Sequence, residues 1–253
     1  MLYLFFEDGM RETADYLKHE INEFFKVFGI SCKCEFFNPN PVLTKWASYP
    51  TNCDKAINFK LFGDMDEIRK FVDSANDLSS IQKAFLIKTD IFDPDVSDNM
   101  KGNFTIDSKP ADIAWMFGVC FSKVKSLVVS DYRLENFSKE SKLFYLYMLF
   151  LHEVGHMLLG TELPWHKDSY GYTPLIGSDQ PAEDSFGKHC VSRECIMYPI
   201  IDIDKKSADA TGSFVKFQND PTEYRDATLV ELVERLGNRK FCEKCFDTLR
   251  SYR

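Results

Sequence analysis

The sequence predicts a layered α/β fold. Short apolar segments of strand length alternate with longer segments that repeat apolar residues every three or four positions. Such alternation is typical of domains in which helices cover a sheet. The chain has 253 residues, 44% of them hydrophobic, which is enough for a sizeable core.

The first segments follow the order strand, helix, strand. Leu2–Phe6 is an apolar run of strand length. Glu12–Phe28 has apolar residues at helical spacing, and Gly29 ends it. Ile30–Phe37 is the second predicted strand, and the Asn-Pro-Asn-Pro segment over 38–41 predicts a turn.

The middle of the chain continues the alternation. Asp64–Leu78 is a predicted helix whose first residue is a good N-cap. Ala84–Lys88 is short and apolar, as in a buried strand. Asp90–Pro110 is rich in Asp, Asn, Pro and Gly and is expected to be mostly loop. Ile113–Phe121 and Val124–Ser130 are the next predicted strands.

The longest predicted helix is Lys139–Leu159, which follows a serine cap and precedes a glycine. Residues 161–188 and 198–222 show little periodicity, and loops of that length are usually functional or disordered. Ala227–Leu236 has a helical pattern. We expect the chain to close with a pair of cysteines and a short tail.

The composition excludes several classes of partner. The net charge is −8 and the pI about 5.2, so the chain is a poor binder of nucleic acid and of anionic membranes. The N-terminal apolar run is too short for a signal peptide. The longest apolar run, Leu143–Leu151, is about half of what a bilayer requires. We expect a cytoplasmic monomer.

Four of the eight cysteines form two pairs at short spacing, which is typical of a metal site in a reducing compartment. The pairs are Cys190 with Cys195 and Cys242 with Cys245. The alternative is four separate buried thiols. Cys120 lies in an apolar stretch and is expected to be a small buried hydrophobe.

The long helix ends in His152-Glu153-Val154-Gly155-His156. Residues four apart on a helix lie on one face, so both imidazoles can bind one zinc ion. The carboxylate of Glu153 can then reach a zinc-bound water, whose pKa the metal lowers, and act as general base and acid. This chemistry hydrolyses an amide. The alternative is a helix end with two ordinary histidines.

A catalytic zinc usually takes three protein ligands. His19 lies on the polar face of the first helix and is expected at the surface. His166 and His189 both remain candidates, because distance along the sequence does not decide between them.

Further groups of residues share their order and spacing with a known family. They are His189-Cys190, Cys195-Ile196-Met197 and Cys242-x-x-Cys245, all after the His-Glu-x-x-His motif. The chain therefore resembles the archaemetzincins, a branch of the metzincin clan of zinc peptidases, whose pattern is HExxHxxGxxHC, four residues, Cys-x-Met and later Cys-x-x-Cys.

Upstream segments also resemble this family. Thr89-Asp90 follows a strand, Phe117-Gly118 lies within one, and the 130–134 segment precedes the long helix. The resemblance covers roughly residues 84–245. It implies a metzincin-like zincin fold, α/β or α+β, with a mixed twisted sheet, a backing helix and an active-site helix.

The resemblance also implies one catalytic domain in two parts. Residues 1–160 would form a sheet and helix subdomain that ends in the active-site helix. Residues 161–253 would form an irregular subdomain with a Met-turn and a four-cysteine zinc site.

One departure from the family pattern is large. The family's third His follows the second by six residues, whereas His189 follows His156 by thirty-three, so about 27 residues are inserted. Either the helix exit is displaced, or the loop over 161–188 forms a lid beside the metal, with side chains that line the substrate cleft. These side chains are Trp165, His166, Tyr170 and Tyr172.

The resemblance assigns a role to each site residue. His152, His156 and His189 would bind the catalytic zinc, with Glu153 as the general base. Met197 would form the apolar floor below that zinc. The structural zinc would be held by Cys190, Cys195, Cys242 and Cys245. Tyr198 could donate to the oxyanion, and Ile113–Phe121 could pair with the substrate backbone.

The predicted function is that of a zinc metallopeptidase with two zinc ions per chain that acts on peptides. The resemblance also suggests cleavage from the N-terminus, as in some members of the family. Two alternatives remain. One is a zinc amidase for a small molecule, because the insert could narrow the cleft. The other is a binding protein that the cysteine site organises.

Overall fold

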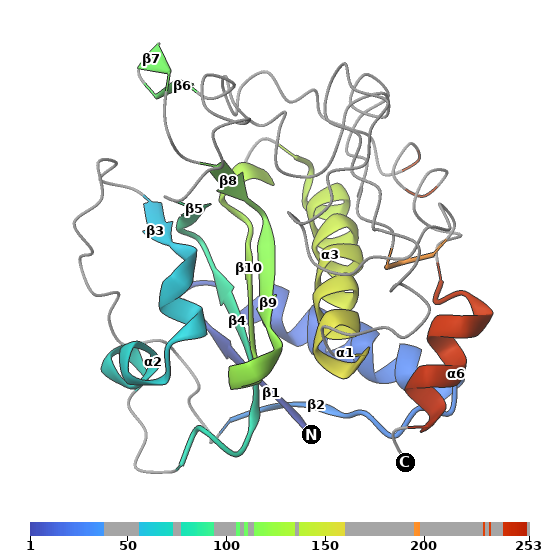
Figure 1. The fold of residues 1–253 in the computed structure, drawn as a ribbon. Coiled ribbons are helices and arrows are strands. Elements are labelled where there is room, and N and C mark those ends of the chain that lie inside the picture. The colour runs from blue at the N-terminus through green and yellow to red at the C-terminus, as the bar shows by residue number, and fades with distance from the viewer. Residues whose placement is uncertain are drawn as a thin grey trace.

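The centre of the molecule is a five-stranded mixed sheet with the strand order β2-β1-β4-β10-β9 (Figure 1). Its strands are β1 Leu2–Phe6, β2 Cys34–Phe36, β4 Gln82–Ile87, β9 Gly118–Phe121 and β10 Ser126–Ser130. All neighbours pair in parallel except β9, which pairs antiparallel with β10 at one edge.

The computed structural model describes only part of the chain. The described residues are 1–37, 56–72, 77–93, 105–106, 109–110, 114–134, 137–159, 195–197, 230, 233 and 240–251.

A smaller sheet continues from the central one. It has the order β3 (Ala56–Asn58), β5 (Asp90–Asp93) and β8 (Ala114–Met116). A third, two-stranded sheet is formed by β6 (Thr105–Ile106) and β7 (Lys109–Pro110). In the range 90–110, which was expected to be mostly loop, residues 90–93, 105–106 and 109–110 form strands, and the others lie outside the described residues.

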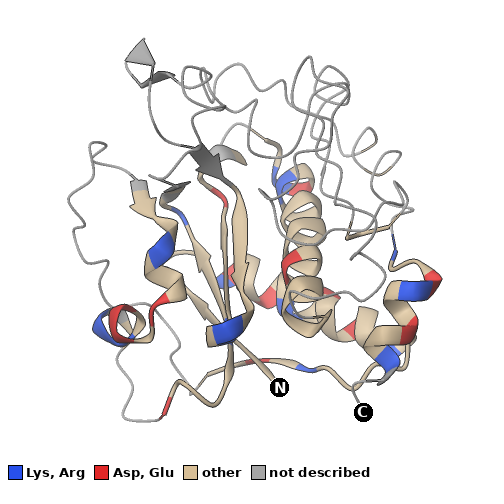
Figure 2. Ribbon diagram, in the orientation of Figure 1, with Lys and Arg blue, Asp and Glu red and all other residues tan. Residues whose placement is uncertain are grey.

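Both faces of the central sheet are covered. Helices α1 (Arg11–Val27) and α3 (Lys139–Leu159) contact each other over one face, and α6 (Glu243–Ser251) packs on α3. The 3-10 helix η1 (Phe59–Gly63) and α2 (Met65–Phe71) cover the other face. Figure 2 shows charged residues mainly on the helices, whereas most of the length of the central strands carries none.

The strands alternate between these two faces, as a period of two requires. Leu4 and Leu86 pack toward α1 and α3, whereas Phe5 and Phe85 pack toward η1 and α2. Burial on both faces explains why the strands appear in the sequence as continuous apolar runs.

Several predicted elements agree with the structure. Leu2–Phe6 and Lys139–Leu159 match residue for residue, and the first helix differs by one residue at each end. Asp64 caps α2 by accepting hydrogen bonds from the backbone N–H groups of Asp66 (2.8 Å) and Glu67 (3.3 Å).

Other predictions were wrong in their extent. The helix over 64–78 ends at Phe71, because Val72 is extended and Asp77 accepts a hydrogen bond from the N–H of Ser79. The strand over 30–37 is a strand only over Cys34–Phe36, which are the residues that pair with β1.

Three further segments differ from expectation. The strand over 113–121 breaks at Phe117, where the chain passes from the smaller sheet to the central one. Val124 belongs to a 3-10 helix, and β10 begins at Ser126 after Lys125 turns with φ 53°. The chain closes with a helix, α6, rather than a short tail.

Some expectations lie outside the described residues. They are the turn at 38–41 and the loops over 161–188 and 198–222. The division of the chain at residue 160 stays a prediction. Among the described helices, none combines the length and apolar character needed to cross a membrane.

Candidate functional site

Helix α3 carries two histidines whose ring nitrogens converge. The Nε2 atoms of His152 and His156 lie 3.1 Å apart, and the rings are nearly perpendicular at 84°. Two nitrogens that each lie about 2.0–2.1 Å from one tetrahedral zinc are roughly 3.3 Å apart. The pair therefore fits two positions of a zinc coordination sphere.

The tautomer of His152 follows from its second ring nitrogen. Its Nδ1–H donates to the backbone carbonyl of Ile196 at 2.6 Å, in a buried position. A carbonyl can only accept, so Nδ1 carries the proton in the neutral ring and Nε2 presents its lone pair. An outer carbonyl of this kind orients a metal-binding histidine and raises its basicity.

Glu153 lies beside these histidines with 6% of its surface exposed. Burial raises the pKa of its carboxyl to about 8. A Cβ atom on Gly118 of β9 would come within 3.3 Å of both Cγ and Oε1 of Glu153. The carboxyl group therefore lies directly over the edge strand, and its pKa suits a group that takes and returns a proton near neutral pH.

Met197 packs against the same turn of α3. A side chain on Gly155 would overlap the Met197 Sδ and would come within 3.0 Å of the Phe241 ring. Met197 is fully buried. The structure thus places this methionine against the helix that carries the histidines.

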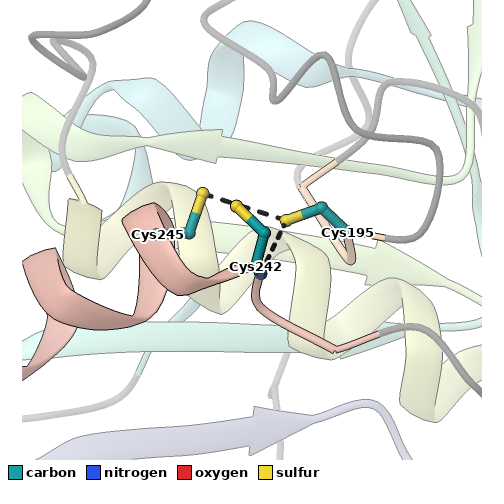
Figure 3. A group of neighbouring side chains, drawn as sticks. All are labelled: Cys195, Cys242 and Cys245. Carbon is teal, nitrogen blue, oxygen red and sulfur yellow. Dashed lines mark hydrogen bonds between the residues drawn. The ribbon is translucent and has the colours of Figure 1, made fainter.

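Three cysteine sulfurs form a second cluster, shown in Figure 3. The sulfurs of Cys195, Cys242 and Cys245 all lie within 4.8 Å of one another, and those of Cys195 and Cys245 are 3.8 Å apart. Two thiolates about 2.3 Å from one tetrahedral zinc are roughly 3.8 Å apart. These residues therefore fit three positions of a structural zinc site.

The remaining predicted site residues lie outside the described residues. They are His189 and Cys190, and the cleft candidates Trp165, His166, Tyr170, Tyr172 and Tyr198. The third histidine ligand and the fourth cysteine ligand therefore stay predictions.

One simpler expectation is met and a second is met in part. The side chain of His19 is 71% exposed, as a surface residue should be. Cys120, expected to be a buried hydrophobe, is only partly buried, but it packs against the core that includes α3, and burial raises the pKa of its thiol well above the ordinary value. This thiol is therefore protonated at neutral pH.

Sequence reasoning missed two kinds of site residue. The Ile196 carbonyl belongs to the backbone, so no residue type announces it. Gly155 and Gly118 act by lacking a side chain. A glycine inside a long helix costs about 1 kcal/mol, and that cost was the one available signal that something packs closely at Gly155.

Comparison with known proteins identifies the fold. No protein-family model matches the sequence, and no curated protein matches it. The chain is similar to the crystal structure of archaemetzincin from Methanopyrus kandleri, with 12% identity, a TM-score of 0.50 and coverage of 99% of this chain and 94% of that one.

Two other solved structures match less well. A zinc-dependent peptidase from Methanocorpusculum labreanum has 15% identity and a TM-score of 0.47, with 98% of this chain and 100% of that chain covered. Archaemetzincin from Archaeoglobus fulgidus, complexed with malonate, has 15% identity, a TM-score of 0.45 and 98% coverage of both chains. The likeness to the Methanopyrus structure confirms the mixed α/β fold that the resemblance implied.

Proposed function

We propose that this protein is a zinc-dependent metallopeptidase that hydrolyses peptide bonds. The observation that carries the proposal is the convergence of the His152 and His156 Nε2 atoms at 3.1 Å, on the helix that also carries the buried Glu153. The archaemetzincin-like fold supports it.

The catalytic metal would be held by His152 and His156, with His189 as the proposed third ligand. When bound, zinc would polarise the substrate carbonyl and lower the pKa of a water molecule. Glu153 would take the proton from the attacking water and pass it to the departing amine. The Ile196 carbonyl would hold the ring of His152 in the orientation that this requires.

A second, structural zinc would be held by Cys195, Cys242 and Cys245, with Cys190 as the proposed fourth ligand. The spacing of the three described sulfurs supports this assignment. The chain would then bind two zinc ions.

The substrate would be a peptide that pairs with the edge strand β9. This strand lies at the edge of the central sheet and contacts α3. Strand addition supplies affinity through main-chain hydrogen bonds. We further propose cleavage from the N-terminus, with His166 and Tyr198 at the cleft, in a cytoplasmic monomer that binds neither nucleic acid nor membranes.

The decisive experiment replaces Glu153 by glutamine and measures turnover of a panel of peptides together with zinc content. We expect turnover to fall about 10²- to 10⁴-fold with zinc retained, because the amide cannot accept the proton. The control is Glu140→Gln, an exposed acid in the first turn of the same helix, which should keep full activity.

Other outcomes favour the alternatives. Hydrolysis of small amides but not of peptides by the unaltered protein would favour a zinc amidase. Zinc bound by the cysteines alone, with no turnover on any substrate, would favour a binding protein.

A further inference from the structure

Three consecutive residues, Cys195, Ile196 and Met197, link the cysteine cluster to the histidine site; we call them the 195–197 segment. The Cys195 sulfur belongs to the cysteine cluster, and the Ile196 carbonyl accepts the hydrogen bond from His152. Met197 fills the space beside Gly155. All three residues of the segment are at most 1% exposed.

The other side of the segment is held by the strand-like residues before α6. The N–H of Ile196 donates to the carbonyl of Lys240 at 3.0 Å, and Cys195 forms an isolated β-bridge with Lys240. The N–H of Cys242 donates to the Cys195 sulfur at 3.3 Å. The position of the Ile196 carbonyl therefore depends on how the cysteine cluster joins these two pieces of chain.

The dependence is strong because the segment has little regular structure of its own. Its described residues form a bridge and a turn, with no helix or strand ladder to fix them. A cross-link through sulfur ligands is an effective constraint for such a segment. Without it, the carbonyl would lose its fixed place opposite the His152 Nδ1.

We propose that the cysteine cluster is a positioning element for the histidine site. Through the 195–197 segment it holds the Ile196 carbonyl against His152 and so raises the affinity of the two histidines for metal. Loss of the cluster by mutation then weakens metal binding at the histidines through the loss of this hydrogen bond. The proposal rests on the proposed function, because it assumes that the histidines bind metal.

The test uses the full chain with Cys242→Ser/Cys245→Ser. Zinc affinity of the histidine site is measured by competition with a chelator, and the imidazole ¹⁵N shifts of His152 are measured by NMR in the metal-free protein. We expect affinity to fall about 10- to 100-fold, the usual loss when an outer hydrogen-bond partner is removed. We also expect the shifts to change from one Nδ1–H tautomer to a mixture.

A matched control separates this effect from general destabilisation. Cys32→Ser/Cys34→Ser also removes two thiols, but in and beside β2, and Cys34 is fully buried. This control should lower the melting temperature while leaving zinc affinity and the His152 tautomer unchanged. Should the double variant at 242 and 245 fail to fold, Cys242→Ser alone removes the least buried sulfur of the cluster.

The outcomes distinguish the two proposals. An unchanged affinity and an unchanged tautomer in the cluster variant would overturn the positioning role and leave the peptidase proposal standing. If the histidines of the unaltered protein bind no zinc, the peptidase proposal fails. The tautomer of His152 in the metal-free protein then still decides whether the cluster holds the carbonyl in place.

Discussion

Two glycines shape the candidate site by leaving space. Gly118 in β9 makes room for the Glu153 side chain, and Gly155 in α3 makes room for Met197. Because it has no Cβ atom, each glycine lets a side chain of the candidate site approach its backbone closely. Since both glycines lie within regular elements, the cost in conformational entropy, about 0.5–1 kcal/mol each, is offset by this close approach.

The first prediction concerns Gly118→Ala. The new Cβ atom would lie 3.3 Å from the Glu153 Oε1 and 3.1 Å from the carbonyl oxygen of Val128, so the carboxyl group must shift. We expect kcat to fall about 10- to 100-fold with KM and zinc content little changed, because small misplacements of a reacting group have effects of that size. Steady-state kinetics would measure it.

The control for this prediction lies on the opposite face of the same strand. Val119 packs toward η1 and α2, away from Glu153. Val119→Ala should lower stability but leave kcat unchanged. Equal losses of kcat in the two variants would mean that Gly118 matters only for folding.

The second prediction concerns Lys83, a lysine in β4 with no exposed surface. Its Nζ donates, at 2.8 Å each, to the carbonyls of Leu78, Ile81 and Val124. Burial lowers its pKa to about 8, so the three carbonyls hold an ammonium group at neutral pH. An unfolded lysine has a pKa of about 10.4.

The sign of the pH effect follows from these two values. Between pH 8 and about 10.4 the unfolded chain keeps the proton and the folded chain has lost it, so the free energy of unfolding rises with pH. Across that interval, the free energy of unfolding of the unaltered protein should therefore rise with pH relative to that of Lys83→Met. Urea unfolding at several pH values would measure both. A constant difference would mean that the pKa of Lys83 in the folded protein is not lowered.

At the scale of single elements, the edge strand β2 is protected by a side chain of α1. The Asn22 Nδ2 donates to the Cys34 carbonyl at 2.8 Å, and the Cys34 N–H donates to the Asn22 Oδ1 at 2.7 Å. The amide therefore takes the place of a neighbouring strand at this edge. An edge without such cover can pair with another chain.

The third prediction follows from this pairing. Asn22→Ala should lower the free energy of unfolding by about 1–3 kcal/mol, because two half-buried backbone groups lose their partner. Asn22→Asp keeps the acceptor but puts a carboxylate oxygen against the Cys34 carbonyl, so it should also lower stability. Urea unfolding would measure both, with the exposed neighbour Glu23→Ala as a control that should change stability by no more than about 0.5 kcal/mol.

The elements show which parts of the fold the sequence can predict. Leu2–Phe6 and Lys139–Leu159 were predicted well because apolar pattern, caps and length all agree within the segment. The break at Phe117 was not predicted, because the residues on both sides of it favour a strand. Only their pairing shows the break, since β8 pairs in the smaller sheet and β9 in the central one. Helix α6 was missed because its cysteines suggested a metal site and its apolar positions are few.

The candidate site divides in the same way. Side chains with distinctive chemistry, such as His152, Glu153 and Cys245, can be named as candidates from residue type and spacing. The Ile196 carbonyl was not, because its role depends on a contact across 44 positions of the chain. Long-range backbone contacts carry no local signal.

At the scale of the whole molecule, one core lies on each face of the sheet, and the described C-terminal residues belong to only one of them. Cys195, Met197, Cys245 and Leu249 belong to the core under α1 and α3, whereas the core under η1 and α2 is formed by residues 5–128. Removing metal from the cysteines should therefore loosen the core under α1 and α3 more than the core under η1 and α2.

The last prediction uses this asymmetry. Helix α6 has 9 residues, shorter than the roughly 12–15 at which isolated helices become marginally stable, so it depends on packing and on its cysteines. Prolonged treatment with a strong zinc chelator should lower the melting temperature and speed amide hydrogen exchange in α6, with little change in β4 and β10. Hydrogen exchange followed by mass spectrometry resolves these segments.

The Cys242→Ser/Cys245→Ser variant should show the same fast exchange in α6 before chelation and no further change after it. If β4 and β10 loosened as much as α6, the two faces of the sheet would unfold as one unit, because the stability that the cysteine cluster supplies would then be shared across the whole fold.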